Sequence, residues 1–519
     1  MLTSVKWENY SHFSHLAVEY CVGVGHYTIH RTPEPVQPPP SRTAARKLDL
    51  PPGSFAAYHP DPLQSPGMAA LPHWDAAARA AEAAISGFEQ QHGGFASRVG
   101  WALQRSESAG SSTIEDVTPS LRRVARAEAV ASDGGDPRDS AASEALGNIA
   151  ATRLAASLGD DGGPITADGI LEVHAALMGH TSKSEMGGRL RPGWVRVGGV
   201  LGGWPPPAYV APPAEEVPGL LDDLVGYINT TGHHPVVAAA VAHAQFEAIH
   251  PFRDGNGRTG RALIQAVLRR GGVTRYTTPP ISALLALNRD EYIGAIAAAC
   301  FDGPADPASQ AAAFDPWVSL FASTAEASCS YAGGLIAKID AVVGGWDEKL
   351  VGRRGSAARK VVEHLPEMPV FSVQGMAAKL GISSTAAYRA TDRLAAAGIV
   401  APVRGKHRGR GLFEAPDILD VFKAEPDEHD TGASGSGPVP ASQVALAAGV
   451  AGRADARRAR AAEAVRLRRA GRTHQQIGDA LGMSASWART ATKGVARGGG
   501  RRGVCLGPSE SAVGELGNL

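Results

Sequence analysis

Apolar residues recur at helical spacing along most of the chain, and this pattern predicts a mainly α protein. The helices that we expect from the spacing span residues 75–91, 98–108, 141–158, 166–178, 217–230, 235–249, 262–268, 288–300 and 315–343. One stretch breaks the pattern, because residues 188–197 alternate apolar and polar side chains as a strand does. Gly198 and Gly199 mark a turn, and residues 204–210 could return as the second strand. A small β-hairpin is therefore expected inside a helical domain, with an irregular loop as the alternative.

A polar loop between the expected helices 235–249 and 262–268 carries the densest chemistry in the chain. It reads His250-Pro251-Phe252-Arg253-Asp254-Gly255-Asn256-Gly257-Arg258-Thr259-Gly260-Arg261. Gly255 and Gly257 allow positive φ and can turn backbone N–H groups inward. Those groups would lie at the start of the next helix, where unpaired donors and the helix dipole favour an anion. The loop is therefore expected to cradle a phosphate.

Four side chains of this loop suit a bound nucleotide. Arg258 and Arg261 are three residues apart, so they share a helix face and can grip further phosphates. Asp254 offers the hard oxygen ligand that phosphate-bound Mg²⁺ prefers. His250 is the group best suited to accept a proton near neutral pH. Taken singly, these features could be purely structural, since a Gly-Asn-Gly turn is often only a turn and a His before Pro usually has a structural role.

The whole string resembles the active-site motif of the Fic family, His-x-Phe-x-Asp/Glu-Gly-Asn-Gly-Arg-x-x-Arg, at every defined position. Residues 243–249 also resemble the helix that leads into this motif. Fic enzymes mostly transfer the AMP of ATP to a hydroxyl side chain of a target protein. The resemblance thus implies a Fic-type helical core and a protein adenylyltransferase that modifies a Ser, Thr or Tyr hydroxyl and releases pyrophosphate.

The family's roles carry over to individual positions. The resemblance implies that His250 deprotonates the incoming hydroxyl, which attacks the α-phosphate in line. Asp254 would hold Mg²⁺ between the α- and β-phosphates. The amides of Gly255, Asn256 and Gly257, with the Asn256 side chain, would stabilise the transferring phosphoryl group.

Further residues complete the implied nucleotide site. Arg258 would contact the β-phosphate side and Arg261 the γ-phosphate. Phe252 would point into the core and fix the nucleotide-binding loop. Tyr292, in the expected helix 288–300, either lines the adenine pocket or belongs to the core.

A possible inhibitory segment, Ser111-Ser112-Thr113-Ile114-Glu115-Asp116, follows the expected helix 98–108. A hydroxyl residue followed by an acid is also an ordinary helix cap. The segment resembles the self-inhibiting Fic motif Ser/Thr-x-x-x-Glu-Gly/Asn, whose glutamate pairs with the second motif arginine, here Arg261. Ser111 and Glu115 occupy the defined places, but Asp116 stands where Gly or Asn is expected, which leaves the aim of the glutamate open. The expected hairpin resembles the Fic flap, which holds a target segment by strand pairing.

The C-terminal third predicts two further modules. Residues 355–424 read as a winged helix, with helix, Gly turn and helix followed by a basic wing at 404–410, and such domains bind DNA or proteins. An acidic linker, 425–440, precedes residues 441–503, which carry thirteen Lys or Arg against three Asp or Glu. This segment reads as a second helix-turn-helix and a nucleic-acid candidate, with a solvated basic tail as the alternative.

Composition sets the remaining expectations. The chain has 51 basic and 51 acidic residues, so it is no general nucleic-acid binder, and its four cysteines are too scattered for a disulfide framework or metal site. With neither a membrane-length apolar run nor a signal pattern, a cytoplasmic protein without membrane contact is expected. We expect a disordered extension over 1–55, a helical segment over 56–131, the catalytic domain over 140–346 and a disordered tail over 504–519.

Two other functions stay open at this point. The chain could be a DNA-binding regulator whose Fic domain only senses a nucleotide, although the intact motif argues against this. It could also use another donor, such as UTP or GTP, or transfer phosphate or phosphocholine. The target protein, the DNA site and whether the chain forms a homodimer are not visible in the sequence.

Overall fold

The structure is a computed structural model of the 519-residue chain. It describes residues 19–22, 25–31, 54–64, 72, 74–92, 96–137, 139–197, 209–276, 279–300, 307–350, 355–403, 411–422, 466–468, 472–474, 476–477 and 492. Two compact units are present, Met1–Pro426 and Asp427–Leu519. The division between them falls inside the linker expected at 425–440.

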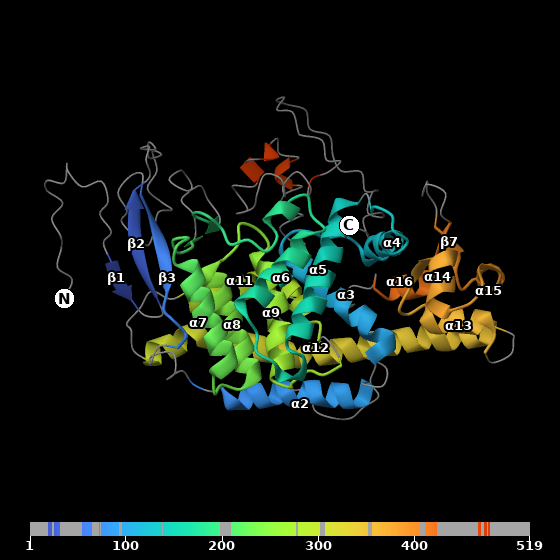
Figure 1. The fold of residues 1–519 in the computed structure, drawn as a ribbon, viewed down its shortest axis with the longest axis horizontal. Helices are drawn as coiled ribbons and strands as arrows, with labels where there is room; N and C mark the ends of the chain where they lie inside the picture. The colour runs from blue at the N-terminus through green and yellow to red at the C-terminus, as the bar shows by residue number, and fades with distance from the viewer. Residues whose placement is uncertain are drawn as a thin grey trace, which may run out of the picture. The chain divides into compact units, whose positions relative to one another are not determined.

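The first unit is mainly helical, as expected (Figure 1). Its helices are α2 (Asp75–His92), α3 (Ala96–Ile114), α4 (Leu121–Ser132), α5 (Ser140–Leu158), α6 (Ala167–Met178), α7 (Val217–Thr230), α8 (Pro235–Ile249), α9 (Asn256–Arg270), α10 (Ile281–Leu287), α11 (Arg289–Ala299) and α12 (Pro307–Lys349). The expected helices all form, whereas α4 and α10 are additional. α12 begins eight residues earlier than expected and continues past Pro316 to Lys349.

The core is built around α8 and α9, which lie at the centre of the helical body (Figure 1). All but two of the 15 residues of α8 are buried, so it is apolar all round, as an interior helix must be. α5, α7 and α12 pack around this pair, and α2 covers α12 on its outer side. The indole N–H of Trp317 on α12 donates to the carbonyl of Ala240 on α8 at 2.7 Å.

α3 approaches the core closely at its C-terminal half. A Cβ on Gly110 would lie 2.3 Å from the Cα of Ala283, so only glycine lets α3 and α10 pack at this distance. Glu107 on α3 accepts the Ser282 N–H at 2.7 Å, and the Asn148 side chain of α5 donates to the Ser108 carbonyl at 2.8 Å. The end of α3 that carries the expected inhibitory segment is thereby fixed on two sides.

The expected hairpin is present but short. β4 (Arg196–Val197) pairs antiparallel with β5 (Tyr209–Val210), and residues 198–208 between them lie outside the described part of the chain. The strand expected over 188–197 is therefore wrong for its first eight residues, which form turns and loop. The reason is local: Gly188 has φ +68°, and the Arg191 side chain bonds to backbone carbonyls and holds this segment as a loop.

A three-stranded antiparallel sheet precedes the helices, in the order β1 (Glu19–Val22), β2 (Gly25–Arg31) and β3 (Ser54–Pro60). The disordered extension expected over 1–55 is thus wrong for these strands, because residues 19–31 are rich in Tyr, Val, Thr and Ile, which favour strands. The Pro-rich residues 33–40 lie outside the described part. β3 packs against the hairpin through a buried cluster of Phe55, Ala57 and Val210.

Residues 357–422 form the last part of the first unit (Figure 1, orange). The order of elements is α13 (Ala357–His364), β6 (Val370–Ser372), α14 (Val373–Leu380), α15 (Ser384–Ala396), β7 (Ala401–Pro402), β8 (Leu412–Glu414) and α16 (Pro416–Val421). The strands form an antiparallel sheet in the order β6-β8-β7. Glu414 on β8 accepts from both Arg122 and Arg126 of α4, which ties this part to the helix after α3. The basic stretch 404–410 lies outside the described residues.

The second unit is described at a few positions only. Residues 466–468 and 476–477 are helical. Thr473 and Gln476 form a reciprocal cap, because the Thr473 hydroxyl accepts the Gln476 N–H at 3.2 Å and the Gln476 side chain accepts the Thr473 N–H at 3.0 Å. A helix thus starts where the sequence predicts one, while the other expectations for 441–519 fall mostly outside the described residues.

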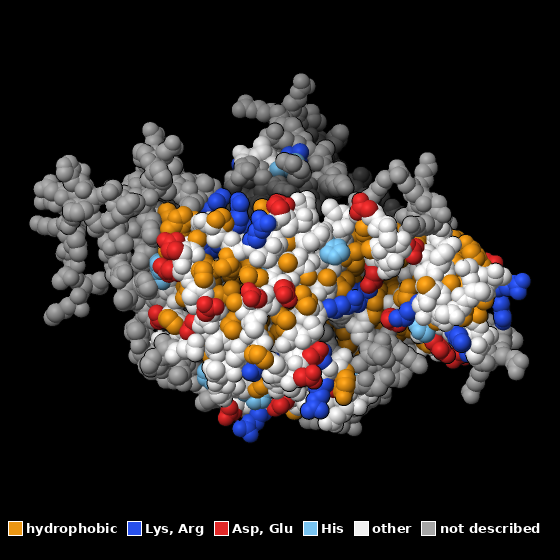
Figure 2. Space-filling view, viewed as in Figure 1, with side chains coloured by type: hydrophobic (Ala, Val, Ile, Leu, Met, Phe, Trp, Pro, Cys, Tyr) orange, Lys and Arg blue, Asp and Glu red, His pale blue; other side chains and the backbone are white. Residues whose placement is uncertain are grey.

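Figure 2 shows acidic, basic and hydrophobic side chains interspersed over one face of the molecule. Among the described residues, none of the helices combines the length and the apolar character needed to cross a membrane.

Candidate active site

The central loop runs from the end of α8 to the start of α9. His250 caps α8 in the left-handed conformation, with φ 50° and ψ 59°, and Gly255 precedes α9 with φ 80°. No side chain caps the start of α9, so the first N–H groups of the helix keep their capacity to bind an anion. The expected turn into a helix N-terminus is therefore present, with Gly255 supplying the positive φ.

Arg191 holds the His250 end of this loop. Its buried guanidinium donates to the carbonyls of His250 at 2.8 Å, Ile249 at 3.3 Å and Pro212 at 2.6 Å. Its own N–H donates to the Pro251 carbonyl at 2.9 Å. A non-glycine residue in the left-handed region costs free energy, and these bonds offset that cost at His250. Sequence reasoning missed this residue because it lies in the stretch that was expected to be a strand.

His174 on α6 supports the middle of the loop. Its ring stacks on Phe252 with the centroids 3.6 Å apart, and Phe252 is fully buried, as the resemblance implied. Nε2 of His174 donates to the Asp254 carbonyl at 3.1 Å, while Nδ1 accepts the Gly188 N–H at 3.0 Å. Burial lowers the pKa of His174 to about 4, so the ring is neutral, as this pair of bonds requires. His174 carried no signal in the sequence.

The Asn256 side chain forms hydrogen bonds within the loop. Its Oδ1 accepts the Phe252 N–H at 2.8 Å, and its Nδ2 donates to the Phe252 carbonyl at 2.9 Å. These two bonds leave the second Nδ2 hydrogen unused, and the expected contact of this side chain with the transferring phosphoryl group stays a prediction.

Gly257 also plays a different part from the one expected. Positive φ occurs at Gly255 but not at Gly257, which lies in the first turn of α9. A Cβ at Gly257 would lie 2.1 Å from Oε1 of Glu115 and 2.9 Å from Nη1 of Arg261. Glycine is needed here for space, since a carboxylate packs directly against the backbone.

His250 is arranged as a base. Its Nδ1 lies 3.2 Å from the Glu247 carbonyl, which can only accept, so Nδ1 carries the hydrogen and Nε2 keeps its lone pair. Burial lowers the pKa of His250 to about 4, which keeps the ring neutral at physiological pH. A neutral imidazole with a free Nε2 can accept a proton.

A cavity of about 660 Å³ opens beside the loop, within the usual size range of small-molecule sites. The predicted residues that line it are Glu115, His250, Asp254, Gly255, Asn256, Gly257, Arg261 and Tyr292. Apolar side chains of α11, Ile293, Ile296 and Ala297, form another part of the wall. A polar, anion-binding end and an apolar end are what a nucleotide requires.

Tyr292 was expected either to line the nucleotide pocket or to belong to the core, and it does both. It is buried and lines the cavity. Its hydroxyl lies 2.8 Å from Nε2 of His243 and accepts from Nη1 of Arg261 at 3.3 Å. Burial lowers the pKa of His243 to about 3, so that ring is neutral and can accept from the tyrosine. Tyr292 thus helps to orient Arg261.

Asp254 and Arg258 take part in ionic contacts at the loop. Asp254 pairs with the Lys183 ammonium, and its Oδ1 lies 3.5 Å from Nη2 of Arg258. Burial acts against the change, but Lys183 and Arg258 lower the pKa of Asp254, so it is a carboxylate. Arg258 is buried, and its Nη1 lies 3.4 Å from Glu144 on α5. Arg258 is not among the cavity-lining residues, so the described geometry does not place it at the predicted phosphate contact.

Asp254 fits the implied Mg²⁺. Among the described residues no cluster of three or more His, Cys, Asp or Glu could hold a metal alone. Mg²⁺ bound to a nucleotide needs only one or two carboxylates, because phosphates and water complete its shell. Asp254 is ionised, its side chain is 32% exposed and it lines the cavity, so it suits that role.

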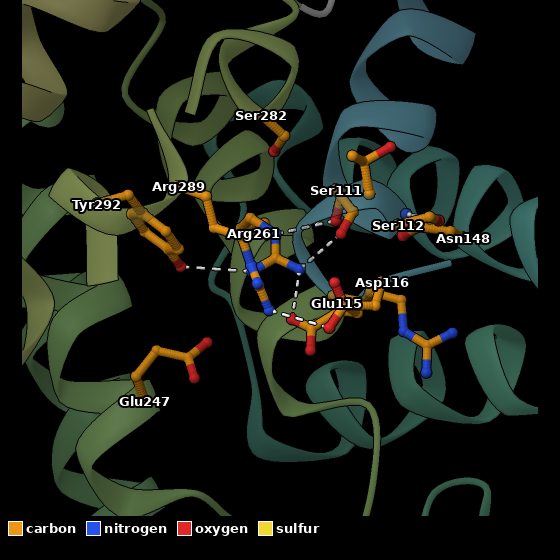
Figure 3. A network of polar contacts seen from close by, with 12 residues as sticks. Ser111, Ser112, Glu115, Asp116, Asn148, Glu247, Arg261, Ser282, Arg289 and Tyr292 are labelled. Carbon is orange, nitrogen blue, oxygen red and sulfur yellow. Dashed lines mark hydrogen bonds and ion pairs between the residues drawn. The ribbon is translucent and has the colours of Figure 1, made fainter. Parts of the chain in front are cut away.

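The segment Ser111–Glu115 at the end of α3 closes on Arg261 (Figure 3). Arg261 donates to the Ser111 hydroxyl at 3.0 Å, to the Ser111 carbonyl at 2.8 Å and to Oε1 of Glu115 at 2.8 Å. Burial works in the other direction, but the Arg261 charge lowers the pKa of Glu115. The structure thus brings together the residues that the resemblance paired, across 146 positions of sequence.

Asp116 does not prevent this contact. It adopts φ 61°, the left-handed conformation that Gly or Asn favours, and Asp tolerates it better than most residues do. Its carboxylate lies 3.3 Å from Nη2 of Arg289 and not on Arg261. The aim of Glu115, which the sequence left open, is toward Arg261.

Parts of the chain are similar to known proteins. Residues 164–268 match the Fic/DOC family. The chain is 29% identical over 224 residues to protein adenylyltransferase fic-1 of Caenorhabditis elegans, which covers 42% of this chain and 39% of that protein. It is 38% identical over 111 residues to protein adenylyltransferase Fic of Aedes aegypti, covering 21% of this chain and 20% of that protein. The chain therefore matches about two fifths or less of the length of these relatives.

A solved structure is similar over a larger part. The structure of a Fic family protein from Desulfovibrio desulfuricans matches with a TM-score of 0.41 and 22% identity, over 65% of this chain and 95% of that one.

Proposed function

Because the chain carries a Fic/DOC family domain at residues 164–268, we propose that it is a protein adenylyltransferase that moves AMP from ATP to a protein hydroxyl. The observation that carries the proposal is a neutral histidine with a free Nε2 beside an uncapped helix N-terminus, in a cavity of nucleotide size. The similarity of part of the chain to proteins named protein adenylyltransferase supports the same proposal.

The proposed reaction uses groups of this site. His250 Nε2 accepts the proton of a Ser, Thr or Tyr hydroxyl, and the hydroxyl oxygen attacks the α-phosphorus. The bond from the α-phosphorus to the bridging oxygen breaks, and pyrophosphate leaves. The N–H groups at the start of α9 hold the phosphate charge at fixed positions, which is the main form of catalysis in such transfers. The apolar side chains of α11 in the cavity wall suit the adenine ring of ATP.

Asp254 is the residue that would hold Mg²⁺. When bound, the ion neutralises charge on the phosphate oxygens. Lys183, now paired with Asp254, would have to give up that contact.

The same site is proposed to be self-inhibited. With Glu115 on Arg261, the arginine that the resemblance assigns to the γ-phosphate is occupied. The Glu115 carboxylate also stands against Gly257, at the anion-binding end of the cavity. A triphosphate must therefore displace Glu115 or bind in another pose.

The test is labelling with ATP that carries ³²P at either the α or the γ position, in native lysate and with the protein alone. We expect Glu115→Gly to transfer the α label and not the γ label, and Glu115→Gly with His250→Ala to transfer neither. Transfer of the γ label would indicate a kinase-like reaction. Equal efficiency with UTP or GTP would replace ATP by another donor.

A second function is proposed for residues 357–422, which we assign as a winged helix that contacts nucleic acid. The order of helices and the sheet order β6-β8-β7 support this assignment. α15 would be the reading helix, and Tyr388 and Arg389 on it are exposed. Fluorescence anisotropy with duplex DNA tests it: Arg389→Ala should weaken binding, and unchanged binding would favour a protein partner.

A further inference from the structure

The cavity contains a carboxyl group that the reaction above does not use. Glu247 lies on α8, one turn before His250, and its side chain is 15% exposed. Its Oε1 is buried and has no hydrogen-bond partner among the described residues, while its Oε2 lies 3.9 Å from Nδ1 of His250. Figure 3 shows the carboxyl pointing from α8 into the space between Tyr292 and Glu115. An unpartnered buried carboxyl is costly, which calls for an explanation.

His250 poses a complementary problem. When it accepts the proton of the target, it becomes a cation in a buried site, and burial already lowers its pKa to about 4. The nearby Arg191 charge acts in the same direction. The Glu247 carbonyl fixes Nδ1–H but carries no net charge. A base in this position needs an anion on its Nδ1 side.

We propose that Glu247 is a positioning residue for His250, and that its carboxylate balances the charge that the imidazole gains during transfer. This inference rests on the proposed function. The two groups lie three residues apart on one helix end, so a small rotation of the Glu247 side chain brings Oε2 onto Nδ1–H. The arrangement has the logic of a histidine whose second nitrogen is held by a carboxylate.

The charge of Glu247 depends on its neighbours. On its own helix it faces the neutral rings of His243 and His250, and from α9 it faces Arg261. Burial raises the pKa of Glu247 to about 7; Arg261 opposes this rise, and Glu115 of α3 adds to it.

The remaining neighbours are Tyr292 of α11 and Cys300, which follows that helix. Burial raises the pKa values of both, so both stay neutral. The phosphates of ATP would act on the carboxyl in the same direction as Glu115. Glu247 is thus neutral at acid pH and becomes an anion as pH rises through about 7 or somewhat above.

Because His250 and Glu247 ionise at different pH values, the pH dependence of the transfer rate distinguishes their contributions. If His250 acted alone, the transfer rate would be flat from about pH 5 upward, because its pKa is about 4. If Glu247 supports it, the rate rises with pH through the ionisation of Glu247. A rise in the transfer rate near pH 7, which we call the limb of the pH–rate profile, therefore indicates that the Glu247 carboxylate takes part.

The experiment compares Glu247→Gln, which keeps the shape and removes the charge, with Glu247→Asp, in the full chain carrying Glu115→Gly. We expect Glu247→Gln to lower the transfer rate at pH 8 by about 10- to 100-fold, less than the ~10⁴-fold loss for a directly hydrogen-bonded triad carboxylate. The limb near pH 7 should disappear, and the affinity for a non-hydrolysable ATP analogue should stay within about threefold. Glu247→Asp should keep a reduced limb. A Glu247→Gln profile that matches the parent in height and shape overturns the inference.

A second measurement does not depend on activity. In protein with ¹⁵N-labelled histidine, the His250 ring signals, assigned with His250→Asn, should shift through the ionisation of Glu247 near pH 7. Glu247→Gln should abolish that shift. If the shift is present but no AMP is transferred under any condition, the proposed function fails and the pairing of Glu247 with His250 stands. If AMP is transferred and no such shift exists, the pairing is wrong.

Discussion

Removing the Glu115 carboxylate should free Arg261 and raise AMP transfer. In the structure Arg261 is buried, and the Glu115 side chain is 40% exposed. A charge-assisted hydrogen bond of this kind contributes about 1.5–3 kcal/mol when buried. Because half-exposed pairs are weakened by solvent, we take about 1–2 kcal/mol here. At 1.36 kcal/mol per factor of ten, Glu115→Gly should raise the transfer rate by roughly 5- to 30-fold.

The assay is the initial rate of self-labelling with α-³²P-ATP at saturating ATP and Mg²⁺. Glu115→Gln, which keeps a hydrogen bond and removes the charge, should fall between wild type and Glu115→Gly. Asp116→Gly is the matched control, because Asp116 is already in the required conformation and pairs with Arg289. It should change the rate by less than about threefold, since an exposed pair contributes only ~0–1 kcal/mol. Equal rates for wild type and Glu115→Gly would refute the inhibitory contact.

His250→Ala should lower transfer by ~10²–10⁴-fold in kinetic assays and leave ATP-analogue binding nearly unchanged; a wild-type rate would remove it as the base. Arg191→Lys should lower the transfer rate by about tenfold or more, because an ammonium cannot reach three carbonyls at once. An unchanged rate would show that the loop keeps its conformation without the guanidinium. Glu414→Gln should lower the free energy of unfolding in urea by about 1–3 kcal/mol, since two arginines lose their carboxylate, and an unchanged midpoint would contradict this. Removing residues 441–519 should remove most of any duplex DNA binding that depends steeply on salt, because this part carries the basic segment. Undiminished binding would place the DNA contact in another part of the chain.

Much of the helical core follows from local signals. α7 and α8 have the predicted ends, because helical periodicity is strong and Pro at the first turn marks the start of each. Part of the cavity lining was also found from sequence, since the twelve consecutive positions 250–261 supply seven of its twenty lining residues. The pairing of Glu115 with Arg261 came from the family resemblance and not from spacing.

The residues that support the loop could not be predicted in this way. Arg191 and His174 act on backbone carbonyls and amides that only the tertiary fold brings near them. The two hydrogen bonds of the Asn256 side chain to the backbone of Phe252 are likewise visible only in the loop geometry. The strands over residues 19–31 were missed because a neighbouring Pro-rich stretch dominated the reading of that region.

The central claim is that this chain attaches AMP to a hydroxyl through His250, and intact-mass and peptide mass spectrometry test it most directly. Glu115→Gly protein incubated with ATP and Mg²⁺ should gain the mass of one or more AMP groups on Ser, Thr or Tyr, with one pyrophosphate released for each. The same protein with His250→Ala should gain none. A phosphate adduct, or an AMP adduct that persists without His250, would contradict the account.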